Sequence, residues 1–179
     1  MRFLLLIWIT IGWYDAAIAN NNINIDKVRT LYEKGAVEEK ANREMLAILD
    51  SITLRNPLLL GYKASGTMMR AKYVSNPFAK LSYFNKGKKM LESAIAANKE
   101  SVELRFLRFM VQANAPIFLN YTANIETDKA FILTNIANMP ELKAKQFVIR
   151  VLSKSNYLNE NEKIKISSGT NKTKLVQNI

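Results

Sequence analysis

The sequence predicts an all-α protein of about seven helices, built as stacked antiparallel hairpins or as an irregular helical bundle. Apolar residues recur at helical spacing along most of the chain, and no stretch shows the alternation of a strand. Asn-Pro pairs stand where helices would begin, because asparagine is a good N-cap and proline suits the first helical position.

The first residues have the features of a secretory signal peptide. Arg2 supplies a positive start, residues 3–13 are apolar, and residues 17–19 (Ala-Ile-Ala) form a small-x-small cleavage site. The apolar segment is too short for a spanning helix. We therefore expect residues 1–19 to be removed after Ala19, leaving a periplasmic or secreted protein with no transmembrane segment. An uncleaved N-terminal anchor is the alternative.

The first four expected helices cover residues 26–35, 37–52, 57–74 and 77–95. An apolar stripe marks the first of them, formed by Val28, Leu31 and Tyr32. Gly35 ends this helix or kinks a longer one. Asn-Pro pairs at 56–57 and 76–77 begin the third and fourth helices.

Three more helices are expected: one at residues 102–114, one from a cap at Asn124 or Thr127 to about residue 138, and one from Pro140 to about residue 154, with a short turn at 117–119. Ser101 can cap the first of them, whose narrow polar stripe indicates a helix sandwiched between others. Short connections make consecutive helices antiparallel neighbours. We therefore expect residues 20–166 to form a single helical domain and residues 167–179 a disordered basic tail.

The composition excludes several kinds of chemistry. The chain has no His and no Cys, so histidine-based triads, the usual transition-metal sites and disulfides are excluded. Neither glycine-rich phosphate motif occurs. We expect no cofactor, no metal and no enzymatic activity. An enzyme would have to use groups such as Lys80 as a base with Glu103.

Two helices carry a charge on the face that should be apolar. Lys80 projects beside Gly87 and Leu91, and Glu103 lies among the apolar residues of the helix at 102–114. An unpaired buried charge is costly, so we predict a buried ion pair between Lys80 and Glu103. The alternative is that Lys80 extends to water. Lys72 is a second basic group on a nominally buried face and another possible partner for Glu103.

The basic residues are unevenly distributed. The net charge is +11, and no Asp or Glu occurs from Ser51 to Leu91. This block is either a solvated lysine-rich surface or a site for an anionic ligand such as phospholipid, lipopolysaccharide or acidic polymer. The candidate ligand-binding residues are Lys72, Lys80, Arg105, Arg108 and Tyr62. Nucleic acid is not expected, because the chain has an export signal and no reader motif.

Residues 87–100, GKKMLESAIAANKE, resemble the second helix of a tetratricopeptide repeat. Gly87, Leu91 and Ala94 stand at its small, large and small positions. The resemblance departs at Lys99, where the repeat has proline, and no second copy follows at a period of about 34 residues. It implies stacked helix hairpins with a protein-binding groove. The whole chain also resembles small exported helical proteins of Gram-negative bacteria, which implies no activity.

Two functions from different classes remain. The first is an exported, non-enzymatic helical protein that binds another envelope protein or takes part in envelope assembly. The second is a binding module for an anionic lipid, glycan or polymer that uses the acid-free block at 51–91. The salt dependence of binding separates the two.

Overall fold

The computed structural model describes residues 23–51 and 55–176, with side chains up to residue 168. These residues form eight α-helices, three short 3₁₀ turns and no strand, which confirms the predicted all-α class. The α-helices are α1 (Ile25–Gly35), α2 (Glu39–Asp50), α3 (Pro57–Met69), α4 (Pro77–Ala97), α5 (Val102–Asn114), α6 (Ile125–Asn135), α7 (Leu142–Lys154) and α8 (Glu160–Val176). The 3₁₀ turns are η1 (Arg70–Lys72), η2 (Ile117–Leu119) and η3 (Ile136–Asn138).

Local capping explains where three of the helices begin. The side chain of Asn56 accepts a hydrogen bond from the backbone N–H of Leu58 at 2.8 Å at the start of α3. Asn76 does the same for Phe78 at 2.8 Å at the start of α4. Ser101 caps α5 in the same way. These caps satisfy backbone donors that the first turn leaves without a helical partner, as the sequence predicted.

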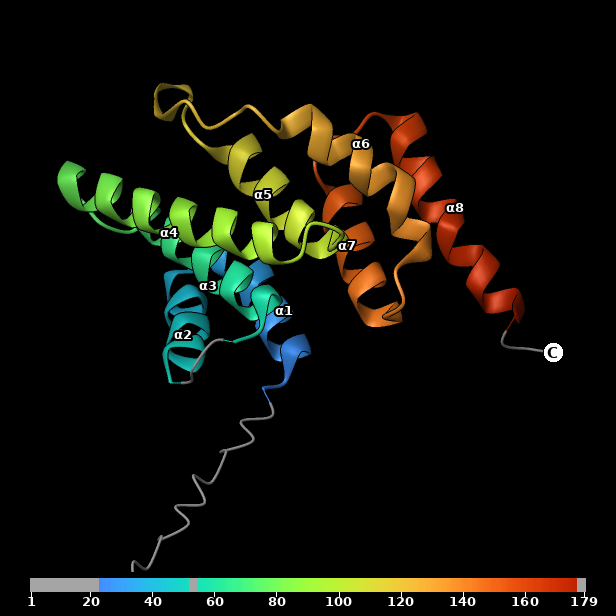
Figure 1. Cartoon of the computed structure of the whole chain (residues 1–179), viewed down its shortest axis with the longest axis horizontal. Helices are drawn as coiled ribbons and strands as arrows, with labels where there is room; N and C mark the ends of the chain where they lie inside the picture. Colours follow the sequence, from blue (N-terminus) through green and yellow to red (C-terminus); the bar gives the residue numbers. More distant parts are fainter. Residues whose placement is uncertain (1–22, 52–54, 177–179) are drawn as a thin grey trace, which may run out of the picture.

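Helix α5 lies at the centre of the fold. It packs against α3, α4, α6 and α7, so that it is enclosed on several sides as its narrow polar stripe predicted (Figure 1). Its side chains Leu104, Phe106 and Leu107 are completely buried. Every charged group on this helix therefore has to be neutralised by residues from its neighbours.

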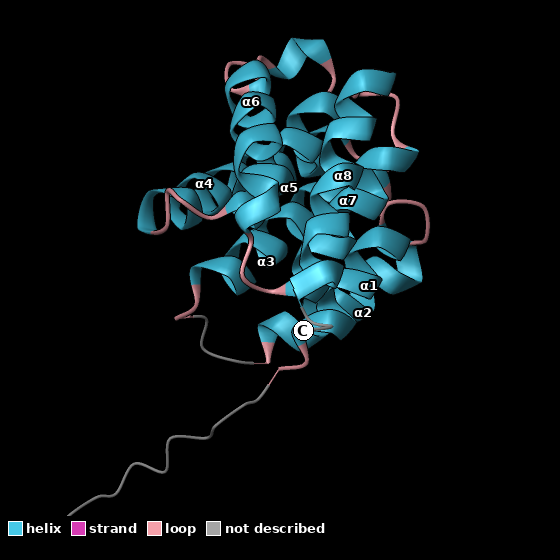
Figure 2. Ribbon diagram, turned by 90° about the vertical axis from the view of Figure 1, so that its right-hand side faces the viewer, coloured by secondary structure: helices cyan, strands magenta, loops and turns pink. Residues whose placement is uncertain are grey.

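The helices pack in pairs, and α3 with α4 is the closest pair. A Cβ atom at Gly87 of α4 would lie only 2.6 Å from the backbone oxygen of Ala64 in α3, so only glycine permits this approach. Helices α1 and α2 form a second pair. Seen from the side, α4 lies on one face of the molecule and α1 and α2 on the opposite face (Figure 2).

The C-terminal region differs from the sequence prediction. Helix α8 continues to Val176, through most of the segment predicted to be a disordered tail. The backbone N–H of Asn159 donates to the Glu162 carboxylate at 2.8 Å, and the N–H of Glu162 donates to the Asn159 side chain at 2.9 Å. This reciprocal capping box starts a helix that the weak apolar pattern did not reveal, and Ile166 anchors it in the core.

The predicted signal peptide at residues 1–19 lies outside the described residues. None of the helices described in the structure is long and apolar enough to cross a lipid bilayer.

Candidate functional site

The first charged cluster, which we call the Arg29 cluster, joins α1, α3, α5 and the residue before α7. Arg29 is 2% exposed and Glu103 is 4% exposed. The guanidinium binds Glu103 through two hydrogen bonds of 2.8 and 2.9 Å. It also contacts Glu141 at 2.6 Å and Asp26 at 2.9 Å. The hydroxyl of Tyr62 donates to the same carboxylate of Glu103. Two charges in the interior are thus paired and hydrogen-bonded, as burial requires.

The titration of this cluster follows from the same contacts. Burial by itself lowers the pKa of Arg29, but the hydrogen bonds to Glu103 and Glu141 outweigh it, so the pKa is raised. Burial raises the pKa of Tyr62 well above the ordinary value, and the charge of Glu103 adds to the shift. The hydrogen bond from Arg29 lowers the pKa of Glu141. Arg29 therefore stays cationic and Tyr62 stays protonated, which is the arrangement of a closed ion pair.

The second charged cluster, which we call the Arg108 cluster, joins α4, α5, α6 and the segment before α6. Arg108 is 4% exposed and Asp128 is completely buried. The guanidinium binds Asp128 at 2.7 and 2.9 Å and Glu92 at 2.8 Å. Arg105 adds a contact to Asp128 at 3.1 Å. The hydroxyl of Tyr121 donates to Glu92 at 2.5 Å, and burial with this contact raises the pKa of Tyr121. This cluster too is neutralised within the fold.

The predicted ion pair between Lys80 and Glu103 is wrong in its partner. Glu103 is buried, as predicted, but it binds Arg29, which α1 brings to it. Lys80 lies in the first turn of α4, where the side chain reaches solvent, as the alternative interpretation held. Lys72 is also exposed, and its ammonium group donates to the backbone oxygen of Ala36 at 2.6 Å, just beyond the end of α1. Neither lysine therefore contacts Glu103.

The five candidate ligand-binding residues do not form one site. Tyr62 belongs to the Arg29 cluster, whereas Arg105 and Arg108 belong to the Arg108 cluster. Lys72 and Lys80 are exposed outside both clusters. Sequence reasoning missed Arg29, although its place beside Val28 at the edge of the apolar stripe was a usable signal. Glu92 lies on the polar side of α4 in the sequence pattern, yet it is half-buried and binds Arg108.

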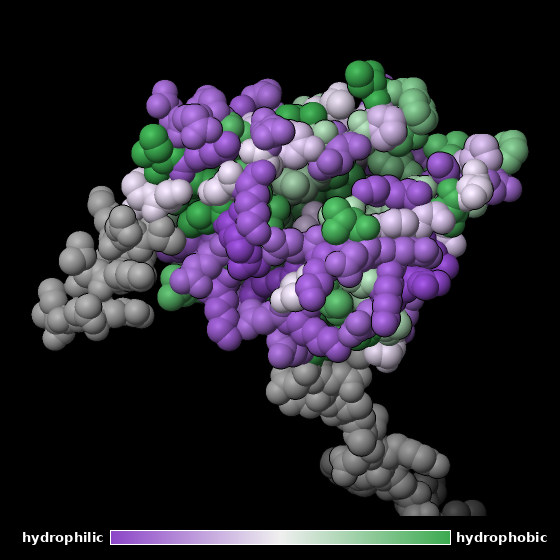
Figure 3. Space-filling model, turned by 180° about the vertical axis from the view of Figure 1, so that it is seen from behind, coloured by the Kyte–Doolittle hydropathy of each residue, from purple (hydrophilic) through white to green (hydrophobic). Residues whose placement is uncertain are grey.

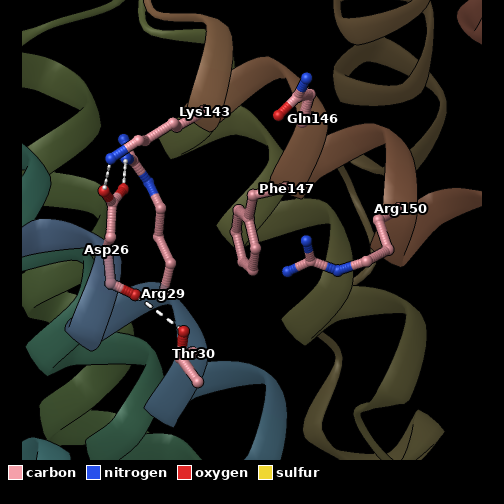
Figure 4. Close-up of a pocket in the computed structure, with 7 residues that line it drawn as sticks. All are labelled: Asp26, Arg29, Thr30, Lys143, Gln146, Phe147 and Arg150. Atoms are coloured by element: carbon pink, nitrogen blue, oxygen red, sulfur yellow. Dashed lines mark hydrogen bonds and ion pairs between the residues drawn. The ribbon is translucent and has the colours of Figure 1, made fainter.

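A shallow depression of about 230 Å³ lies between α1 and α7 (Figure 4). Its lining residues are Asp26, Arg29, Thr30, Lys143, Gln146, Phe147 and Arg150. Lys143 binds Asp26 at 2.8 Å, and Arg150 binds Glu33 at 2.8 Å while lying over the ring of Phe147. The cations of this depression are thus already paired with carboxylates of α1. Seen from behind, the molecule shows a broad hydrophilic area with hydrophobic patches beside it (Figure 3).

A different surface, which we call the α4–η2 end, combines exposed apolar and unpaired basic side chains. Phe78 and Leu81 in the first turns of α4 are 84% and 47% exposed, and Ile117 and Phe118 in η2 are 89% and 83% exposed. Three exposed lysines of α4 have no acidic partner among the residues that the structure describes: Lys80, Lys86 and Lys89.

Within the described ranges, no group of three acidic side chains is arranged so that it could hold a metal ion. Comparisons with protein-family models, with curated proteins and with solved structures gave no match for this chain. The assignment of function therefore rests on the geometry described above.

Proposed function

We propose that the protein is an exported, non-enzymatic helical protein that binds another protein and takes part in an assembly of the cell envelope. The observation that carries the proposal is the exposure of large apolar side chains on the outside of a fold whose buried arginines and carboxylates are already paired. Large apolar side chains that remain exposed on a folded protein mark surfaces for interaction with a partner. The signal-like N-terminal sequence supports export, and the tetratricopeptide-like sequence at 87–100 supports protein binding.

The buried clusters support a structural role rather than a catalytic one. An enzyme using Lys80 and Glu103 would need these groups within hydrogen-bond reach of one substrate. Lys80 lies in solvent, and Glu103 is held by Arg29 and Tyr62 in the interior. The Arg29 and Arg108 clusters instead connect α5 to the helices around it, so we assign them to positioning the helices.

Affinity capture from detergent-solubilised bacterial envelope tests this proposal. The bait is residues 20–179, which include every helix that the structure describes. We expect one envelope protein in stoichiometric amount, retained when the salt concentration is raised from physiological to ~0.5 M, where the Debye length is only ~4 Å. Capture of phospholipid or glycan without any protein would overturn the proposal.

The second candidate function is the binding of an anionic ligand by the acid-free block at 51–91. It is favoured by Lys80, Lys86 and Lys89, which have no acidic partner in the described part of the chain. On the opposite face, charges such as those of Lys143 and Arg150 are paired across α1 and α7. Unpaired cations gathered on one helix attract anions more strongly than paired ones. Binding of this kind should weaken steeply as salt is added.

A further inference from the structure

The exposed apolar residues and the acid-free segments of the chain coincide. A second stretch without Asp or Glu runs from Leu104 to Ile125, in addition to the block at 51–91. The four apolar side chains of the α4–η2 end all lie in these two stretches: Phe78, Leu81, Ile117 and Phe118. Val37 is equally prominent, with 78% exposed, but the two residues that follow it are glutamates. Both pairs of apolar side chains thus belong to stretches of the chain that carry basic residues and no acidic ones.

The two parts of this end are held together by the fold. The ring of Tyr121, two residues beyond η2, packs edge-on against Phe84 of α4 with ring centroids 5.8 Å apart. The ammonium of Lys88 lies 4.7 Å from the centre of the same Tyr121 ring. The start of α4 and the turn η2 both project toward the left end of the molecule in Figure 1. Both pairs of apolar side chains therefore belong to elements at the same end of the structure.

The turn η2 presents its side chains on a fixed backbone. The N–H of Leu119 donates to the backbone oxygen of Pro116 at 3.0 Å, and the N–H of Asn120 donates to that of Ile117 at 3.0 Å. Asn120 adopts the left-handed conformation, with φ of 46°, a region that asparagine tolerates better than most residues. Ile117 and Phe118 consequently protrude without the cost of ordering a loose loop on binding.

We propose that the α4–η2 end docks on the surface of an anionic lipid bilayer. Phe78, Leu81, Ile117 and Phe118 enter the interfacial region, and Lys86 and Lys89, on the same side of α4 as Phe78, contact the phosphates of the head groups. Lys80, on the other side of the helix, adds its positive charge at the start of α4. A bilayer accepts separate protruding side chains without a matching pocket, whereas a folded protein partner needs a contiguous complementary surface. The depression described above is lined by residues of α1 and α7, and none of the four apolar side chains belongs to its lining.

This inference rests on the second candidate function, the binding of an anionic ligand, and names an anionic lipid bilayer as that ligand. It assigns to lipid the four apolar side chains that the first function could also use, so protein binding would have to use the side opposite α4, where α1 and α2 lie (Figure 2). A molecule docked by its α4–η2 end would leave those helices free to bind a protein. The positive net charge of the chain adds a long-range attraction to an anionic leaflet.

Tryptophan fluorescence can report insertion directly. Both natural tryptophans, Trp8 and Trp13, precede residue 20, so residues 20–179 contain none. Single Phe78→Trp and Phe118→Trp variants place a reporter at exposed positions where the fold tolerates it, and Val37→Trp is the matched control. With vesicles of phosphatidylglycerol and phosphatidylcholine, we expect a blue shift and quenching by brominated lipid at positions 78 and 118 but not at 37. No shift at 78 and 118, or an equal shift at 37, would overturn the proposal.

A charge-matched pair of triple variants tests the contribution of the lysines. Lys80→Gln, Lys86→Gln and Lys89→Gln together should weaken vesicle binding roughly 100-fold, from the attraction of each lysine near an anionic surface. The control replaces Lys27, Lys143 and Lys154 with glutamine. It removes the same net charge, but these three lysines are paired with acidic residues. An equal loss in both variants would mean attraction by net charge alone and would refute docking by the α4–η2 end.

The outcomes also separate this inference from the function on which it rests. If polyphosphate binds residues 20–179 in a manner that depends on Lys80, Lys86 and Lys89 while vesicles do not bind, the anionic-ligand function stands and docking on lipid is refuted. If neither polyphosphate nor anionic vesicles bind, both are refuted.

Discussion

Replacing Arg29 with methionine tests whether the Arg29 cluster stabilises the fold. Methionine has a similar length but no charge, so Glu103 would remain 4% exposed with no cation beside it. Tyr62 would be the hydrogen-bond partner left to it from the described cluster. Removing one partner of a buried ion pair costs about 3–5 kcal/mol, because the other charge is left uncompensated.

The structure also predicts an order among the variants. Arg29 has three carboxylate partners, so Glu103→Gln leaves it bound to Glu141 and Asp26. Glu103→Gln should therefore cost less than Arg29→Met. Arg150→Met is the control, because Arg150 pairs with Glu33 at a half-exposed position, where a pair contributes about 0–1 kcal/mol.

Urea unfolding of residues 20–179, followed by far-UV circular dichroism, gives the free energy of unfolding of each variant. A domain of this size has a total stability of roughly 5–15 kcal/mol, so the expected loss moves the midpoint clearly. If Arg29→Met lost no more stability than Arg150→Met, the reasoning about the Arg29 cluster would be refuted.

Three further predictions follow from the structure. Stability should fall as the pH drops below about 4.5, because Asp26 and Glu141 have lowered pKa values in the folded state. Their charges stabilise the fold above the unfolded pKa, and this contribution is lost as the two groups become protonated. An acid titration that shows no loss of stability between pH 5 and 2 would contradict this. Gly87→Ala should lower the free energy of unfolding by about 1–3 kcal/mol, because the added Cβ meets the backbone oxygen of Ala64. An unchanged midpoint of urea unfolding would mean that α3 and α4 do not approach so closely. Lys80→Met should change the free energy of unfolding by no more than about 0.5 kcal/mol, because Lys80 is exposed. A large loss in a thermal melt would mean that Lys80 is buried, as its helical face predicted.

Local signals in the sequence were sufficient to predict most helix starts. Asn56, Asn76 and Ser101 each bond to backbone N–H groups of their own helix, so the information lies within a few residues. The same kind of signal at Asn159 and Glu162 was available but lay beyond the last clear apolar pattern. Capping chemistry is local, which makes it readable from one sequence.

The partners of the buried charges could not be predicted in the same way. Helical periodicity placed Glu103 on a buried face, but its partner Arg29 lies 74 residues earlier in the chain. Periodicity identifies a face and does not say which helix packs on it. Lys80 is the opposite case, because it lies on the apolar face of its helix and is nevertheless exposed. The first turns of α4 project beyond the helices that cover the remainder of α4 (Figure 1).

Hydroxyl-radical footprinting of residues 20–179 on bacterial envelope membranes is the most direct test that binding occurs at the α4–η2 end. This labelling reports side-chain exposure, and Phe78, Leu81, Ile117 and Phe118 are all exposed in the free protein. We expect these four side chains to lose most of their labelling on the membranes while Val37 keeps its own. Unchanged labelling at all four, with protection at Val37, would contradict the account.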